Sequence, residues 1–167
     1  MKEKLRNHYL KLGPRRFVIL TVILLIILDF LSGYYLKLTW ASKDFSQKML
    51  ELSVENMKLQ VADFSQETMN EMLGLVNMTI DFMLVLLFIN NLFFYFFYLR
   101  KKLWAQSYVL FYTLTAAFLS LAMVFDHQAG LGWLIFNILT IPTYVYLYLG
   151  VKLLKPETTL VPEKKAR

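Results

Sequence analysis

Residues 72–99 read MLGLVNMTIDFMLVLLFINNLFFYFFYL, a stretch in which Asp81 is the only charged residue. A helix needs about 20 apolar residues to cross the roughly 30 Å hydrocarbon core of a bilayer, so this stretch is long enough to span a membrane. Three further stretches meet the same condition: residues 17–36, 103–125 and 131–151. Their only charged residue is Asp29. Because backbone groups in lipid must bond within their own segment, and barrel strands are about half as long, the sequence predicts an all-α integral membrane protein with four transmembrane helices.

The composition agrees with this class and excludes others. The chain of 167 residues is 57% apolar and 18% charged, whereas soluble domains have about 45–50% apolar and 25% charged residues. Cysteine is absent, which excludes disulfides, thiol catalysis and lipid attachment through a thiol. The net charge of +6 comes from basic clusters that flank the apolar stretches. The expected partners are therefore membrane lipids and other membrane proteins, and not nucleic acid.

The distribution of Lys and Arg predicts the orientation in the membrane. Six lie before the first span, three between the second and third, and five after the fourth, against four in the loop between the first two spans. Under the positive-inside rule both termini are cytoplasmic, and we expect a multi-pass protein of the bacterial inner membrane. This divides the chain into a basic cytoplasmic N-terminus (1–16), a membrane domain (17–154) and a flexible cytoplasmic tail (155–167).

The segment 42–71, between the first two spans, is expected to form an amphipathic helix on the outer (periplasmic or extracellular) side. Apolar residues recur in it in steps of four and three, as in a short heptad seam: Leu50, Val54, Met57, Val61 and Phe64. One interpretation is a helix that rests on the outer membrane surface or on a partner subunit. The other is a helix continuous with the second span that packs against copies of itself. Either interpretation makes the seam an interface without chemistry.

Polar side chains are costly in lipid, so each one within a span is expected to have a partner or to line a wet cavity. Asp29 shares a helix face with Ser32, and Asn137 shares one with Thr140. At 1.5 Å per residue, Asp29 and Asn137 lie at about the same depth. We therefore predict an intramembrane polar network in which these two bond directly or through water. Asp29 is then either a clamp between helices or a carboxyl that binds a cation or relays protons.

The second span carries a stripe of polar residues at helical spacing: Asn77, Asp81, Asn91 and Tyr95. Asparagine within a bilayer commonly joins helices, so this stripe is expected to be an oligomer contact, with a pore lining as the alternative. Asn90 is more than a quarter-turn away from Asn91. At least one of the two amides is therefore expected to reach another helix or subunit.

Motifs for catalysis or for metal binding are absent from the sequence. Asp126 and His127 are neighbours, but the only other histidine is His8, which is expected across the membrane. The chain length, the four spans, the inside termini and Asp29 followed by Ser32 resemble lipoprotein signal peptidases, which are intramembrane aspartate-dependent hydrolases. That family has a lysine where this chain has Gly33, and Asp126 lacks the asparagine and arginine neighbours of the family's second aspartate.

The sequence thus predicts a non-enzymatic membrane protein, without cofactor or metal, that is a subunit of a homo-oligomer or of a larger membrane complex. Its contacts are expected to be the outer helix and the polar faces of the spans. The alternative is an oligomeric ion channel or transport pathway lined by the stripe of the second span, with Asp81 at its outer mouth. An intramembrane aspartate-dependent hydrolase is the third and least favoured hypothesis.

Overall fold

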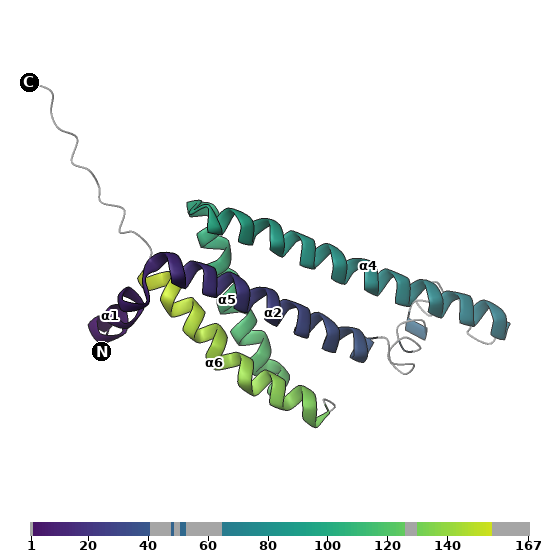
Figure 1. Ribbon diagram of the computed structural model, residues 1–167. Helices are drawn as coiled ribbons and strands as arrows, with labels where there is room; N and C mark the ends of the chain where they lie inside the picture. The colour runs from purple at the N-terminus through teal and green to yellow at the C-terminus, as the bar shows by residue number, and fades with distance from the viewer. Residues whose placement is uncertain (1, 41–47, 49–50, 53–64, 126–129, 155–167) are drawn as a thin grey trace, which may run out of the picture. The chain divides into compact units, whose positions relative to one another are not determined.

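The computed structural model describes residues 2–40, 48, 51–52, 65–125 and 130–154 (Figure 1). The elements are α1 (Lys2–Leu12), α2 (Pro14–Trp40), α4 (Gln66–Leu99), α5 (Leu103–Val124) and α6 (Leu131–Leu153). Four helices are long and apolar enough to cross a membrane: Pro14–Leu38, Glu67–Leu99, Leu103–Val124 and Leu131–Leu153. For the residues that the structure describes, the prediction of an all-helical protein with four helices of spanning length is confirmed, and such helices are typical of a multi-pass membrane protein.

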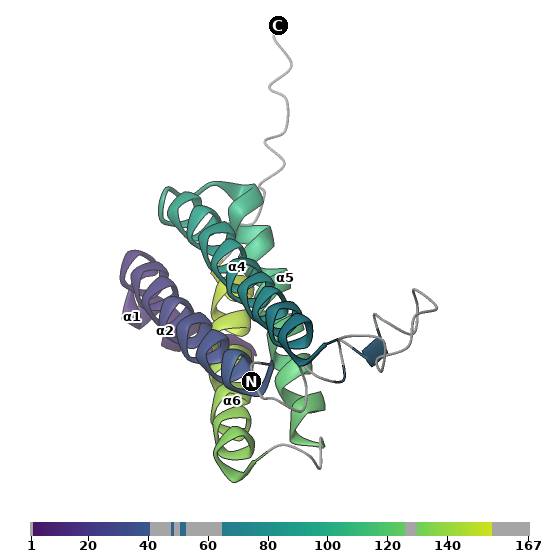
Figure 2. The same ribbon diagram turned by 90° about the vertical axis from the view of Figure 1, so that its right-hand side faces the viewer.

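The chain divides into two units, and each is described by itself. Unit 1 comprises residues 1–23 and 95–167, and so contains α1, the start of α2, the end of α4, α5 and α6. Unit 2 comprises residues 24–94, which form the remainder of α2 and α4. Within unit 1, α5 lies beside α6 (Figure 2), and α1 also contacts α6.

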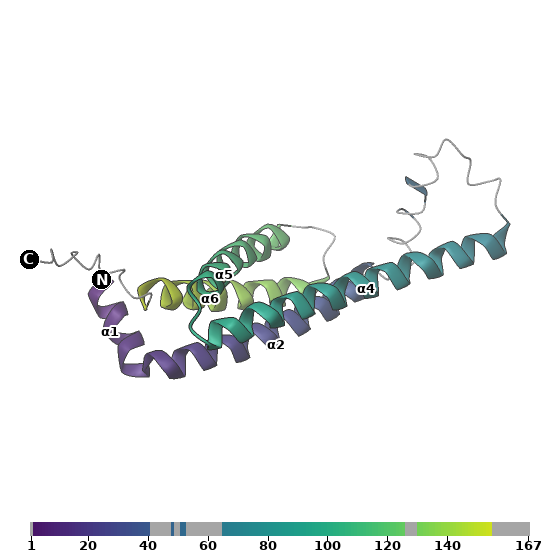
Figure 3. The ribbon, with the colours of Figure 1, turned by 90° about the horizontal axis from the view of Figure 1, so that it is seen from above.

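A sharp turn separates α1 from α2 (Figure 3). Gly13 has φ +85°, a conformation that is nearly free of steric cost only for glycine. Its N–H donates to the carbonyl of Leu10 at 3.1 Å, and its own carbonyl accepts from Phe17 at 2.9 Å. Pro14 then starts α2, where its missing N–H would have had no helical partner. The turn ends the basic N-terminal helix and lets it pack against α6.

The turn between α4 and α5 is a Schellman motif built on lysine instead of glycine. Lys102 N–H donates to the carbonyl of Phe97 at 3.1 Å, and Lys101 N–H to that of Tyr98 at 2.9 Å. Lys101 has φ +58°, the left-handed region. For a residue with a Cβ this conformation costs about 1–2 kcal/mol that glycine would avoid. The chain therefore holds a cation here at a cost in backbone energy.

The core of unit 1 combines apolar packing with buried polar side chains. Its largest buried side chains include Tyr9, Phe17 and Leu147, from three different helices. The buried face of α5 consists of Ala105, Val109, Thr113 and Ser120. The buried face of α6 consists of Asn137, Thr140, Tyr144, Leu147, Gly150 and Val151. The small residues on both faces allow the close backbone approach that favours helix association in lipid.

Candidate functional site

A carboxyl and an amide meet within the apolar part of unit 2. Asn91 on α4 donates from Nδ2 to Oδ2 of Asp29 on α2 at 3.0 Å, and Asp29 is only 9% exposed. A buried carboxyl without a donor would carry a large desolvation cost, so this bond stabilises the pairing of the two helices. The predicted contact between Asp29 and Asn137 joins residues of the two units and stays a prediction.

A second polar contact joins α2 and α4 farther along unit 2. The Nζ atom of Lys37 lies 2.9 Å from Oδ1 and 3.0 Å from Oδ2 of Asp81. About half of each side chain is exposed. An ion pair with this exposure contributes at most about 1 kcal/mol to stability. Asp81, which the sequence placed at the mouth of a channel, thus has a cationic partner within its own unit.

In unit 1 the polar residues of α6 are buried and bonded locally. Thr140 Oγ1 lies 3.3 Å from Oγ of Ser120 on α5 and 3.0 Å from the carbonyl oxygen of Asn137. Asn137 donates from Nδ2 to the carbonyl of Trp133 at 2.9 Å. Asn137 and Thr140 therefore share a buried face, and Ser120 supplies the polar contact from α5.

The polar stripe predicted for the second span does not form one exposed face. Asn91 is bonded to Asp29, and Tyr95 is 1% exposed, with its ring 6.4 Å from that of Tyr112. Asn77 is half-buried. Asn90, by contrast, is exposed, and no hydrogen bond to its side chain is found among the residues that the structure describes. Of the two neighbouring amides, that of Asn91 bonds to Asp29 and that of Asn90 is exposed.

Of the predicted outer segment, residues 42–71, the structure describes residues 48, 51–52 and 65–71, the last of which join it to α4. This helix begins at Gln66, six residues before the predicted start of the span at residue 72. Ser65 precedes it and caps it, because its Oγ accepts the N–H of Thr68 at 3.2 Å. The predicted seam residues lie outside the described residues: Leu50, Val54, Met57, Val61 and Phe64.

An aromatic cluster attaches α1 to the start of α2 and the end of α6, all within unit 1. The Tyr9 hydroxyl donates to the carbonyl of Tyr146 at 2.9 Å, and the Tyr9 ring lies 5.2 Å from the ring of Phe17. The ring of His8 lies beside this cluster, with Nε2 at 3.3 Å from the Tyr146 hydroxyl. Burial, and to a smaller extent the neighbouring Tyr146, raises the pKa of Tyr9 to about 12. The N-terminal helix is thus attached through a phenol that stays neutral.

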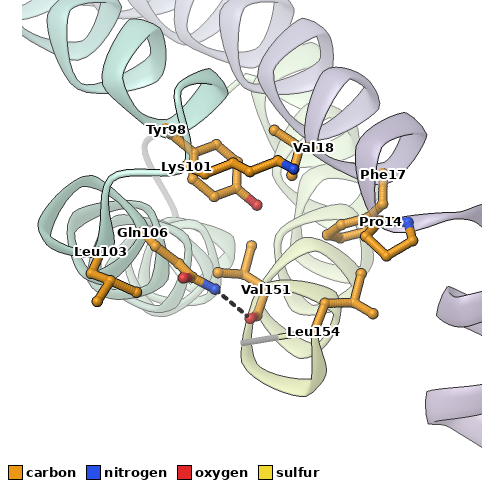
Figure 4. A pocket seen from close by; sticks show the side chains of 9 residues that line it. All are labelled: Pro14, Phe17, Val18, Tyr98, Lys101, Leu103, Gln106, Val151 and Leu154. Carbon is orange, nitrogen blue, oxygen red and sulfur yellow. Dashed lines mark hydrogen bonds between the residues drawn. The ribbon is translucent and has the colours of Figure 1, made fainter. Parts of the chain in front are cut away.

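A pocket of about 180 Å³ opens in unit 1 where four helices end (Figure 4). Its lining residues are Pro14, Phe17, Val18, Tyr98, Lys101, Leu103, Gln106, Val151 and Leu154. Gln106 Nε2 donates to the carbonyl of Val151 at 3.3 Å, which ties α5 to α6 at the base of the pocket. No pattern in the sequence predicted this pocket. The feature of the sequence that could have indicated it is the position of basic residues at the ends of apolar helices.

A wider hollow of about 440 Å³ adjoins this pocket. It is lined by Arg15, Val18, Ile19, Leu99 and Lys101, so Val18 and Lys101 border both spaces. Deeper in unit 1, the buried Thr21 hydroxyl lies beside the Tyr98 phenol, but the geometry of a hydrogen bond is not met.

The described residues contain no group of three or more His, Cys, Asp or Glu side chains that could hold a metal ion. Comparison of the chain with models of protein families, with curated proteins and with solved structures found no match. A functional assignment therefore rests on the chemistry of the residues described above.

Proposed function

We propose that the protein is a non-enzymatic subunit of a membrane assembly, formed by copies of itself or with another membrane protein, and that Asn90 on α4 is a contact residue. The supporting observation is the exposed amide of Asn90 within an apolar helix. Asn90 lies nine residues before Leu99, the last residue of α4, which places the amide about 14 Å from that end. This depth lies close to the middle of a hydrocarbon core of about 30 Å.

An amide at this depth is stabilised if it forms a hydrogen bond with another protein. Its transfer to an environment without hydrogen-bond partners costs several kcal/mol, and lipid tails offer no partner. The residues around Asn90 on the same helix face are apolar and exposed: Met83, Leu86, Leu87 and Phe93. We name these four residues with Asn90 the Asn90 face. The most apolar 18-residue window of α4 contains no buried residue, so this face is open to a partner helix.

The proposed location is the bacterial inner membrane with both termini in the cytoplasm, supported by the distribution of basic residues between the loops. In this orientation the turn at Lys101 is cytoplasmic, and the pair of Lys37 and Asp81 is near the outer surface. The outer segment 42–71 would add a second contact between subunits through its apolar seam.

An ion pathway along the polar stripe of α4 has less support. Asn91 is engaged with Asp29, Tyr95 is buried, and Asp81 is paired with Lys37. A pore built from this stripe would have to break these contacts. An aspartate-dependent hydrolase would need a second carboxyl near Asp29, whereas Asp29 accepts a hydrogen bond from the amide of Asn91.

The absence of cysteine from the sequence makes cross-linking a direct test. Leu86→Cys places a thiol on the Asn90 face. Val85→Cys places one about 140° around the helix from Asn90 and about 100° from residue 86, at nearly the same depth and also exposed. In native membranes, a bifunctional thiol- and photo-reactive cross-linker at residue 86 should join the chain to a second polypeptide, whereas residue 85 should not.

Adding Asn90→Leu to the Leu86→Cys variant should reduce this cross-linking. An interhelical hydrogen bond in lipid contributes about 1–2 kcal/mol, which corresponds to a 5- to 30-fold weaker association. Thr79→Val is the matched control, because the exposed Thr79 hydroxyl bonds the carbonyl of Leu75 in its own helix. Equal cross-linking from residues 85 and 86, or none from either, would contradict the proposal.

A further inference from the structure

We propose that the pocket at the shared ends of α2, α4, α5 and α6 binds one anionic phospholipid, with Lys101 and Arg15 contacting its phosphate headgroup. This proposal is independent of the subunit proposal, because no residue of the Asn90 face lines the pocket. The ligand is a lipid phosphodiester with its glycerol and the first part of an acyl chain.

The position of the pocket along the helices supports a lipid. The lining residues come from the first or last turns of apolar helices: Pro14 starts α2, Leu103 starts α5, Tyr98 is the penultimate residue of α4, and Leu154 follows α6. Helix ends of this kind lie where the hydrocarbon core meets the headgroup layer. The pocket is therefore at the depth of a phospholipid headgroup.

The charges at the pocket match an anion. Lys101 and Arg15 are both exposed, and neither forms an ion pair with any residue that the structure describes. Figure 4 shows the Lys101 side chain extending across the mouth of the pocket toward Val18, and the Tyr98 hydroxyl pointing into the pocket. Lys101, which borders both spaces, Arg15 in the adjoining hollow and the Tyr98 hydroxyl provide donors that suit the oxygens of a phosphate.

The backbone at Lys101 favours the same conclusion. A residue with φ +58° would be least strained as glycine, and the strain is borne here by a lysine. Replacement by glycine would keep the turn and remove the charge. Variants at Lys101 can therefore test the charge needed for binding separately from the turn conformation needed for folding.

The walls distinguish a lipid from a free phosphate ion. Phe17, Val18, Val151 and Leu154 make most of the pocket surface apolar, and a phosphate ion gains nothing from such walls. The volume of about 180 Å³ equals about six water molecules at 30 Å³ each, which is room for a phosphate with part of its glycerol.

The adjoining hollow provides a place for an acyl chain. Two of its lining residues, Ile19 and Leu99, are exposed apolar side chains on the flanks of α2 and α4. A headgroup held by Lys101 and Arg15 would direct its chain past these residues into the hydrocarbon. The headgroup of an anionic phospholipid matches the basic residues, and its acyl chain matches the apolar walls.

The test measures lipid binding to the full-length protein in a mild detergent by native mass spectrometry. Phosphatidylglycerol and phosphatidylcholine of the same acyl chains are titrated separately, and inorganic phosphate is added as a competitor. The wild-type protein should retain one phosphatidylglycerol with at least tenfold preference over phosphatidylcholine. Millimolar phosphate should not displace it.

Variants identify the pocket as the site. Lys101→Gly and Arg15→Gln should each weaken phosphatidylglycerol binding about fivefold, as expected for one basic residue near a lipid phosphate. Lys101→Gln, which keeps the strained turn, should lose as much binding as Lys101→Gly. Lys152→Gln is the control, because Lys152 is an exposed cation at the end of α6 that contacts Tyr148 and does not line the pocket.

Three results would overturn the proposal. Equal binding of the two lipids would show that no anion is recognised. Displacement by inorganic phosphate would indicate a site for a free anion. An equal loss in Lys152→Gln would indicate general attraction to a basic surface. Thermal unfolding is the control for stability. If the unfolding temperature of Lys101→Gly is equal to or above that of the wild type, its loss of binding does not come from a loss of fold.

Discussion

The contact between Phe17 and Gly150 gives the sharpest test of how unit 1 packs. The Phe17 side chain is fully buried, and three of its ring carbons lie within 2.9 Å of where a Cβ on Gly150 would stand. The ring is bounded by those of Tyr9 at 5.2 Å and Tyr146 at 6.3 Å, so it has little room to move aside. Gly150→Ala therefore overpacks this site, and we expect it to destabilise the protein by about 1–3 kcal/mol.

The magnitude is measured by reversible unfolding in mixed micelles, with a double-mutant cycle to identify the cause. Phe17→Ala alone should cost about 3–5 kcal/mol, because it removes a buried aromatic ring. In that background Gly150→Ala should cost almost nothing, since the ring that the methyl group would meet is gone. Gly74→Ala is the control, because its added methyl group would meet no atom within 4 Å. An equal cost of Gly150→Ala in both backgrounds would refute the packing described here.

Two further predictions concern polar groups. Asp29→Ala and Asn91→Leu, combined in a double-mutant cycle, should show a coupling energy of about 0.5–2 kcal/mol, and strictly additive losses would contradict the hydrogen bond. The pKa of Tyr9 is raised from 10 to about 12, so the stability due to its neutral phenol is intact below pH 10 and is lost as the pH rises toward 12. Tyr9→Phe should remove this alkaline step from a pH titration of unfolding, and a step that persists would belong to another group.

The helices were predictable because membrane thickness fixes their length. The first span was expected over 17–36 and lies within α2, Pro14–Trp40, and the last was expected over 131–151 and lies within α6, Leu131–Leu153. Both helices run past the predicted spans, since a helix does not stop at the edge of the hydrocarbon. The break between α1 and α2 is also predictable from the sequence, because Gly13 permits a positive φ and Pro14 favours the first position of a helix.

The partners of the buried polar groups were less predictable. Counting from the flanking residues Arg16 and Arg100 places Asp29 about 20 Å and Asn91 about 14 Å from the expected membrane boundary, so the count alone does not pair them. The structure bonds these two side chains at 3.0 Å, a pairing that depends on the tilt and stagger of α2 and α4. Tilt depends on how helices pack against one another, and the spacing of residues along one helix carries no information about that packing. The pocket was missed for a related reason, because it is made where the ends of four helices meet.

The depth of a polar group in the membrane determines which kind of partner can satisfy it. The Asn90 amide lies about 14 Å from the end of α4, close to the expected middle of the hydrocarbon, where only another protein offers hydrogen-bond partners, so its exposure favours a second helix. Lys101 and Arg15 lie at helix ends, where lipid phosphates are abundant, so their exposure favours a lipid. Asp29 requires neither, because Asn91 satisfies it within the same unit. Removing Asn90 should therefore change association without changing lipid preference, and removing Lys101 should change lipid preference without changing association.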